Sequence, residues 1–124
     1  MILLNDFFTI EDKTVSDTEI NAQIHINTTH HIFNGHFPNQ PVVPGVCMMQ
    51  MIKEITETVL KIQSNLTQAA ELKFLAVINP QHNNLVHANI KYAEEENGVI
   101  KINASIYNDE LVHFKCKIKL QATT

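Results

Sequence analysis

The segment Gly35-His36-Phe37-Pro38-Asn39-Gln40-Pro41-Val42-Val43-Pro44-Gly45-Val46 decides how the rest of the chain is organised. Its three prolines stand three residues apart, and because each proline fixes φ at about −65°, this stretch is expected to be extended and stiff. It leads directly into a predicted helix over residues 45–63. The segment should therefore hold His36 in a fixed place near the first turn of that helix.

The predicted helix has one apolar side and one polar side. The apolar residues recur at helical spacing, at Met48, Ile52, Ile55, Val59 and Ile62. The opposite side carries Gln50, Glu54, Glu57 and Lys61. We expect Glu57 to pair with Lys61, four residues later, and Glu54 to face solvent. The spacing alone is compatible with either of two roles for Gln50, a solvent-exposed polar residue or a functional residue.

On both sides of this helix the apolar pattern changes to period two, which predicts β-strands. Two strands precede the helix, over residues 7–15 and 20–26, and residues 27–44 are expected to lack regular structure. Four strands follow it, around residues 72–76, 86–92, 100–106 and 112–120. The expected turns between the last three strands are Asn97-Gly98 and Tyr107-Asn108-Asp109-Glu110. We therefore expect residues 1–124 to form a single α+β domain, an antiparallel sheet covered by one helix, and the apolar surface left over favours a dimer.

Composition and charge exclude several classes of function. The 124 residues include nine lysines and no arginine against 13 acidic residues, which gives a net charge of −4 at pH 7. Duplex nucleic acid is excluded as a partner, because binding it requires clustered basic residues that neutralise phosphates. No apolar run reaches the roughly 18 residues of a membrane span, and Asp6 argues against a signal peptide, so we expect a cytoplasmic protein. Cys47 and Cys116 are expected to be reduced core residues.

The start of the predicted helix has the chemistry of a carbonyl-binding site. The N–H groups of Gly45 and Val46 are among the donors that the first turn of a helix leaves unsatisfied, at the positive end of the helix dipole. A carbonyl oxygen bound there would be polarised, and negative charge developing on it would be stabilised. His36 is the side chain best suited to move a proton near neutral pH. The same residues are also compatible with a proline-rich loop in which a histidine only caps or packs.

The segment resembles the signature of the β-hydroxyacyl-acyl-carrier-protein dehydratases, which have a hotdog fold. The matching residues are Gly35, His36, Phe37, Pro38, Pro41, Pro44, Gly45 and Val46. Outside the segment, Lys73-Phe74-Leu75-Ala76-Val77 is similar to the strand that follows the helix in this family. Among its members, the chain is most similar to short dehydratase-like proteins of fatty-acid, polyketide or aryl-polyene pathways.

The resemblance implies a hotdog fold, a dimer as the basic unit, and the removal of water from 3-hydroxyacyl thioesters to give trans-2-enoyl products. It implies that His36 acts at C2 of the acyl chain and that the Gly45 N–H receives the thioester carbonyl. Phe37, Val43 and Val46 are the candidates for contact with the substrate, although the first two are equally compatible with a core position. The substrate carrier is expected to be acyl carrier protein or coenzyme A, with no cofactor and no metal.

Two residues depart from the family pattern. Asn39 stands where the family usually has Gly, and it can preserve the turn because Asn tolerates positive φ. Gln50 stands fourteen residues after His36, where the family has Glu or Asp contributed by the other subunit. A carboxamide cannot donate or take up a proton near pH 7, although it can hydrogen-bond a hydroxyl or a water.

Four interpretations of Gln50 remain open. His36 could perform both proton transfers while Gln50 positions the hydroxyl, or Glu54, one turn further, could replace the missing acid. Gln50 could instead orient a water, which would make the protein an acyl thioesterase. In the fourth interpretation the chain is a non-catalytic acyl-binding subunit of a heterodimeric dehydratase.

Three further groups of residues have simpler interpretations. His30, His31 and His36 lack a supporting acid at metal-ligand spacing, so no metal site is expected. Cys47 is expected to be a small core residue and not a nucleophile. A row of lysines occupies one face of the last strand, at Lys115, Lys117 and Lys119. It could attract an acidic carrier protein, but protection of an exposed sheet edge is the favoured interpretation.

Overall fold

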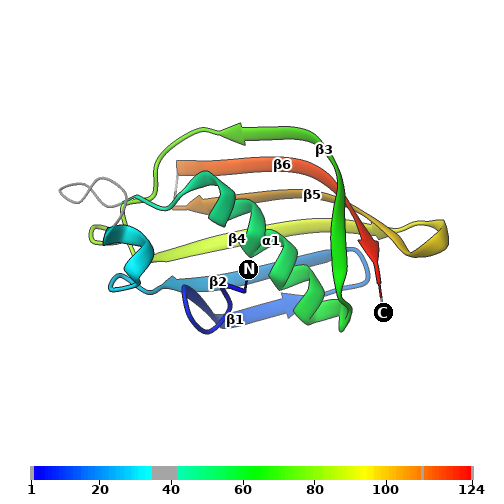
Figure 1. The fold of residues 1–124 in the computed structure, drawn as a ribbon, viewed down its shortest axis with the longest axis horizontal. Helices are drawn as coiled ribbons and strands as arrows, with labels where there is room; N and C mark the ends of the chain where they lie inside the picture. Colours follow the sequence, from blue (N-terminus) through cyan, green and yellow to red (C-terminus); the bar gives the residue numbers. More distant parts are fainter. Residues whose placement is uncertain (1, 35–41, 110, 124) are drawn as a thin grey trace.

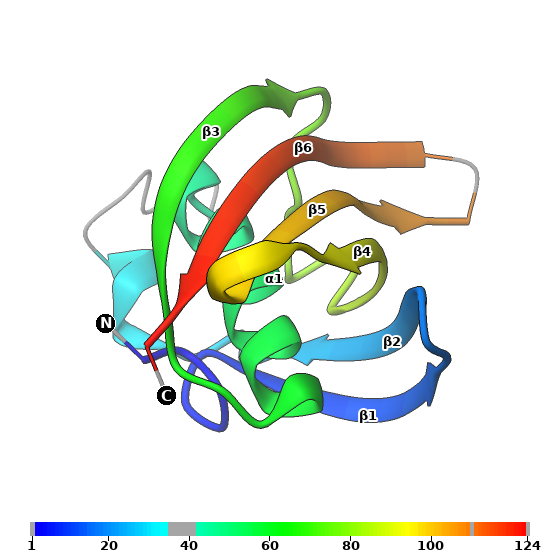
Figure 2. The same ribbon diagram turned by 90° about the vertical axis from the view of Figure 1, so that its right-hand side faces the viewer.

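The fold is an antiparallel sheet of six strands that curves around one helix, as the computed structural model shows (Figures 1 and 2). The structure describes residues 2–34, 42–109 and 111–123. The strands are β1 (Phe8–Val15), β2 (Glu19–Ile26), β3 (Ser64–Phe74), β4 (Leu85–Glu94), β5 (Val99–Asn108) and β6 (Leu111–Ala122), and the helix is α1 (Gly45–Leu60). Two short 3-10 helices are η1 (His31–Asn34) and η2 (Glu96–Gly98). The strand order is β1-β2-β4-β5-β6-β3, which confirms the predicted α+β architecture.

The core lies between the concave face of the sheet and α1. Alternate residues of the inner strands are buried there, as period two predicts: Ile20, Ile24, Val86, Ile90, Ile102, Ile106, Phe114 and Ile118. From the helix, Cys47, Met48, Met51, Ile52 and Ile55 meet them. The apolar stripe predicted for the helix is therefore the side that packs on the sheet. Among the described residues, no helix has the length and apolar character needed to cross a membrane.

The helix ends earlier than predicted, at Leu60 and not at residue 63. Lys61 adopts a left-handed conformation, with φ 58°, and its N–H donates to the carbonyl of Glu57. The predicted ion pair between Glu57 and Lys61 is wrong. The Glu57 carboxylate instead binds the Lys53 ammonium at 3.1 Å and the N–H of Ser64 at 2.8 Å, so it connects the helix to the start of β3.

The sheet differs from the prediction mainly at β3. This strand begins at Ser64, not near residue 72, and it is an edge strand whose side chains are mostly exposed. Its first half has no hydrophobic alternation because it has no buried face. The region 27–44 also contains a short helix, η1, that the prolines and glycine did not predict.

The predicted hairpin at Asn97-Gly98 is confirmed, since both residues have positive φ, 62° and 75°. The interpretation of the lysine row as protection of an edge is wrong. β6 lies between β5 and β3, and its lysines alternate with buried residues, so they occupy the convex face of an interior strand.

Candidate active site

The first turn of α1 follows an N-cap residue that supplies no side-chain hydrogen bond. Pro44 is the N-cap, with φ −61° and ψ 144°, and it has no side chain that could accept a hydrogen bond. The N–H groups of Cys47 and Met48 donate to the Pro44 carbonyl. Within the described residues, the N–H groups of Gly45 and Val46 donate to no backbone carbonyl. Among these residues the positive end of the helix dipole therefore meets no backbone acceptor, and its chemistry suits a carbonyl oxygen or an anion.

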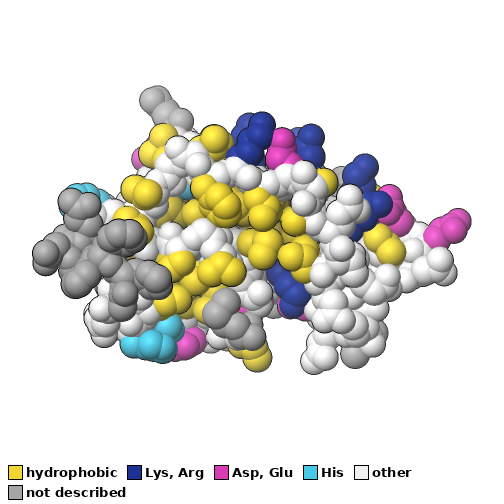
Figure 3. Space-filling view, turned by 45° about the horizontal axis from the view of Figure 1, so that its top comes forward, with side chains coloured by type: hydrophobic (Ala, Val, Ile, Leu, Met, Phe, Trp, Pro, Cys, Tyr) yellow, Lys and Arg dark blue, Asp and Glu magenta, His cyan; other side chains and the backbone are white. Residues whose placement is uncertain are grey.

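An apolar groove of about 500 Å³ lies beside this turn. Its lining consists of Val42, Val43, Pro44, Gly45, Met48, Phe74, Leu75, Ala76 and Val77. Several of these side chains are exposed, including Phe74 at 55%, and Figure 3 shows hydrophobic side chains gathered across this face. The groove has the composition expected of a site for an acyl chain, because its walls are aliphatic and aromatic.

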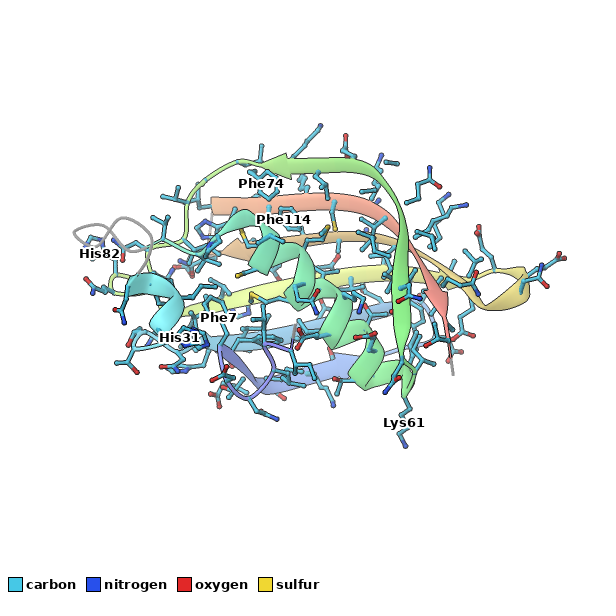
Figure 4. All side chains as sticks on the ribbon, viewed as in Figure 1. Phe7, His31, Lys61, Phe74, His82 and Phe114 are labelled. Carbon is cyan, nitrogen blue, oxygen red and sulfur yellow. The ribbon has the colours of Figure 1, made fainter. Side chains whose placement is uncertain are left out.

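The Phe74 ring lies close to Gly45. A Cβ atom on Gly45 would lie only 2.6 Å from Cε1 of Phe74, which real Cβ contacts essentially never show. The Phe74 ring stacks on Phe114, with centroids 5.1 Å apart (Figure 4). Glycine at this position thus allows the ring to lie against the first turn of the helix.

The predicted site residues are only partly within the described structure. His36 and Phe37 lie outside the described residues, so their predicted roles remain predictions. Val43 is buried, lines the groove, and donates its N–H to the carbonyl of Ile78. Val46 is 58% exposed at the helix start. Gly45 and Val43 are therefore the predicted substrate-binding residues that the structure places at the groove.

Glu54, which was expected to face solvent, is buried, with 6% exposure. The N-terminal segment lies over this side of the helix: the N–H of Leu3 donates to both Glu54 oxygens at 2.9 Å, and the N–H of Leu4 to Oε1 at 2.7 Å. Gln50 Nε2 also donates to Oε2, at 2.8 Å. The sequence signal for this burial is the apolar stretch at the N-terminus, where Leu3 and Phe7 belong to the core.

This arrangement bears on whether Glu54 could replace the missing acid. Backbone and amide N–H groups donate to both of its oxygens. If Glu54 carried a proton, its O–H would face N–H donors and at least one of these hydrogen bonds would be lost. Glu54 therefore acts as a hydrogen-bond acceptor that links the N-terminal segment to the helix and to Gln50.

Both cysteines have the properties of core residues. Burial raises the pKa of the Cys47 thiol, and the negative charge of Glu54 raises it further. Burial also raises the pKa of Cys116 to about 11. Since the thiolate is the reactive form, Cys47 is unsuited to act as a nucleophile despite its place in the first turn of the helix.

His30 has a structural role in the described part of the chain. It is buried, and its Nε2 lies 3.0 Å from a carboxylate oxygen of Asp6. Its Nδ1 accepts the N–H of Ile32, so Nε2 carries the proton and donates it to Asp6. Within residues 2–34, 42–109 and 111–123, no cluster of three or more His, Cys, Asp or Glu side chains could hold a metal ion.

An antiparallel sheet of six strands curved around one central helix is the architecture of the hotdog fold. The model of the ApeI-like family, described as ApeI dehydratase, matches residues 12–118. The chain therefore belongs to the ApeI-like dehydratase family.

Solved structures of the same fold include a dehydratase and a thioesterase. The dehydratase heterocomplex ApeI:P from Xenorhabdus doucetiae contains a chain with a TM-score of 0.72 and 22% identity, covering 90% of this chain and 96% of that one. A hypothetical thioesterase with coenzyme A from Streptococcus pneumoniae has a TM-score of 0.66 and 11% identity, and the similarity covers 97% of this chain and 91% of that one. At these identities the similarity shows the fold alone.

A shorter similarity connects the chain to a curated dehydratase. The 3-hydroxyacyl-[acyl-carrier-protein] dehydratase FabZ of Francisella tularensis subsp. novicida is 40% identical over 47 residues. This match covers 38% of the chain and 29% of the length of FabZ. It adds to the family assignment, whereas the substrate and the activity of the whole FabZ protein do not transfer to this chain on that basis.

Proposed function

We propose that this protein removes water from 3-hydroxyacyl thioesters carried by acyl carrier protein, giving trans-2-enoyl thioesters. In this reaction His36 takes the C2 proton, the C2–H electrons form the C2=C3 double bond, and the C3–O bond breaks. The leaving hydroxyl receives a proton from the His36 imidazolium and departs as water. The Gly45 N–H binds the thioester carbonyl, and Gln50 accepts or donates a hydrogen bond at the hydroxyl.

The observation that carries the proposal is a helix start whose N-cap, Pro44, supplies no side-chain hydrogen bond, beside an apolar groove. Removal of a proton next to a carbonyl places negative charge on its oxygen, and the Gly45 N–H is a donor suited to that charge. The groove beside it supplies aliphatic walls for an acyl chain. Phe37 and Val43 are the residues we propose as parts of that wall.

Because the family resemblance assigns the helix residue to the other subunit, we propose that the complete site forms in a dimer. The edge strand β3 supports this proposal, since its concave side remains exposed at Leu66, Leu72 and Phe74. Their neighbours across the sheet, on β6, are buried. A second hotdog subunit would cover this side, and we propose that the assembled protein acts in the cytoplasm.

The proposal is tested by mass spectrometry of a 3-hydroxyacyl-carrier protein incubated with the pure protein. We expect the mass to fall by that of one water, and we expect no loss with His36→Ala. Release of the free acid would identify the protein as a thioesterase. Full activity of His36→Ala would overturn the assignment of the base.

A second candidate function is favoured by the absence of an acid at position 50 of the helix. Gln50 stands at the position where the family resemblance expects an acid, and the neighbouring buried carboxylate, Glu54, accepts hydrogen bonds. In this alternative the chain is the acyl-binding subunit of a heterodimer whose partner supplies the acid. It predicts that the purified chain is inactive, and that a second hotdog subunit with an intact Glu or Asp co-purifies with it and restores dehydration.

A further inference from the structure

The convex face of the sheet carries most of the basic charge of the chain. The alternation that buries one side of β4, β5 and β6 points the other side outward. Six of the nine lysines lie on this outer side and are called the lysine face: Lys73, Lys91, Lys101, Lys115, Lys117 and Lys119. Elsewhere the chain has three lysines, against 13 acidic residues in all. The lysine face is therefore a basic surface on a protein whose net charge is negative.

Two pairs of lysines stand directly opposite each other on neighbouring strands of this face. Lys73 on β3 is in register with Lys115 on β6, and Lys101 on β5 is in register with Lys119 on β6. Like charges at directly opposed positions destabilise a sheet. Among the described residues, the ion pairs on this face involve Lys73 and Lys119, so Lys101 and Lys115 are not neutralised within the chain. An anionic partner would relieve this repulsion, which indicates a binding surface.

A hollow of about 390 Å³ lies among these side chains. Its lining consists of Gln68, Ala70, Lys101, Ile102, Asn103, Lys117, Ile118 and Lys119. Beside it the register of β3 against β6 shifts at Thr67 and at Ala70, and such bulges bend an edge strand. Ammonium and carboxamide groups from three strands thus surround one depression, and their N–H groups can donate to the carboxylates of a partner.

The size of the lysine face suits a compact acidic protein. From Lys115 to Lys119 the face extends about 13 Å along β6, and it crosses four strands that lie about 4.8 Å apart. A single phosphate group would contact only part of this area. A long polyanion such as duplex nucleic acid would extend past the face to the acidic remainder of the chain, and the convex curvature limits contact with a flat membrane (Figure 2).

We infer that the lysine face is the docking surface for the acidic carrier protein that presents the thioester, an inference that rests on the proposed function. Lys73 and Lys115 lie on the convex side of the same strand pair whose concave side carries the stacked rings of Phe74 and Phe114. Phe74 lines the apolar groove, and residues 75–77 continue the groove wall beyond the end of β3. A carrier on this face can therefore extend its thioester arm around the end of β3 into the groove.

The lysine face and the proposed dimer contact use opposite sides of the sheet. A second subunit on the concave side of β3 would leave the convex side accessible to a carrier. Figure 3 shows basic side chains along the margin of the hydrophobic side chains, so the two kinds of surface adjoin without overlapping. Carrier docking and dimer formation are thus compatible.

The test compares two pairs of lysine substitutions that change the net charge equally. Lys115→Gln/Lys117→Gln removes two charges from the face without breaking an ion pair, and Lys13→Gln/Lys61→Gln, at exposed positions elsewhere, is the matched control. With purified acyl carrier protein as the titrant at low salt, we expect Kd to rise about tenfold in the first variant and less than about twofold in the control. An unchanged Kd in the first variant, or equal weakening in both variants, would overturn the inference.

The same variants have a second readout in the dehydration kinetics. For a 3-hydroxyacyl chain on carrier protein, KM should rise about tenfold in Lys115→Gln/Lys117→Gln, whereas for the same chain on free pantetheine kcat and KM should equal those of the wild type. Equal losses on both substrates would overturn the inference, because the lysines would then act on the site itself. Tighter binding of a DNA duplex or of phosphatidylglycerol vesicles than of the carrier would also overturn it. If the wild type dehydrates neither substrate, the proposed function fails, whereas the titration still decides whether the carrier docks on this face.

Discussion

At the scale of single residues, Gly45 combines a steric constraint with the carbonyl-binding role that we propose for it. We predict that Gly45→Ala reduces dehydration much more than it reduces stability. The new Cβ would lie 2.6 Å from the Phe74 ring, but this ring is 55% exposed and can move. The Tm should fall by only about 4 °C, while kcat/KM falls about a hundredfold because the methyl group stands beside the N–H that we propose binds the carbonyl. Thermal melts and steady-state kinetics on the same preparation measure both.

The double variant Gly45→Ala/Phe74→Leu separates the two causes. The smaller side chain at position 74 relieves the contact, so the Tm should recover while the activity stays low. Recovery of both would mean that displacement of the Phe74 ring, and not obstruction of the helix start, causes the loss.

A second prediction at this scale concerns Cys116 and alkaline pH. Its pKa is raised from 9.0 to about 11 in the folded protein, because the thiol is buried. Between these values the unfolded chain loses the thiol proton while the folded chain keeps it, so stability falls as pH rises. The contribution present below pH 9 is on the order of 2–3 kcal/mol and is lost through pH 11. Urea unfolding from pH 8 to 11 should show a shallower decline for Cys116→Ala than for the wild type; equal slopes would contradict the prediction.

At the scale of secondary structure elements, Glu57 joins the end of α1 to the beginning of β3. Its carboxylate accepts hydrogen bonds from the N–H and Oγ of Ser64, at 2.8 and 2.9 Å, and from Lys53. We predict that Glu57→Ala lowers the unfolding free energy by about 1–3 kcal/mol, because the Ser64 donors lose their acceptor. Lys53→Ala should cost under about 1 kcal/mol, since it removes only a partly exposed ion pair. Urea titration distinguishes them, and equal effects would assign the stabilisation to the ion pair.

At the scale of the whole molecule, one helix does not cover the sheet as far as β3. Leu72 is 38% exposed, although its neighbour across the strand pair, Cys116, is fully buried. We predict that the protein is a dimer joined at this edge and that Leu72→Lys converts it to a monomer in sedimentation equilibrium. Val15→Lys, at an exposed position of the opposite edge strand β1, should leave the dimer intact. A wild type that is monomeric at micromolar concentration would contradict this arrangement.

Local patterns predicted the elements well where each element is buried on one face. The alternation in β2, β4, β5 and β6 and the stripe on α1 are direct consequences of packing against each other. The turn at Asn97-Gly98 was predictable because few residues tolerate positive φ. The first half of β3 was not predictable, because an edge strand with exposed side chains shows no alternation of apolar and polar residues.

The candidate site was likewise predictable only where it depends on local sequence. The helix start at Gly45 was predictable from the prolines and glycine, which act on their own backbone. The buried position of Glu54 was not predictable, because its hydrogen-bond partner Leu3 is 51 residues away and the helical spacing predicts a solvent-exposed side chain. The expected roles of His36 and Phe37 stay predictions.

The order of the main strands and the helix, the residue at which the helix begins and the family to which the signature points could all be predicted from the amino-acid sequence. These depend on backbone restrictions and periodicities that act over a few residues. Three features became known only from the folded structure: the N-terminal segment covers Glu54, β6 is an interior strand, and the Gln50 amide donates to a buried carboxylate. Each of these results from contacts between distant segments, and the spacing of residues along the chain contains no record of which segments meet.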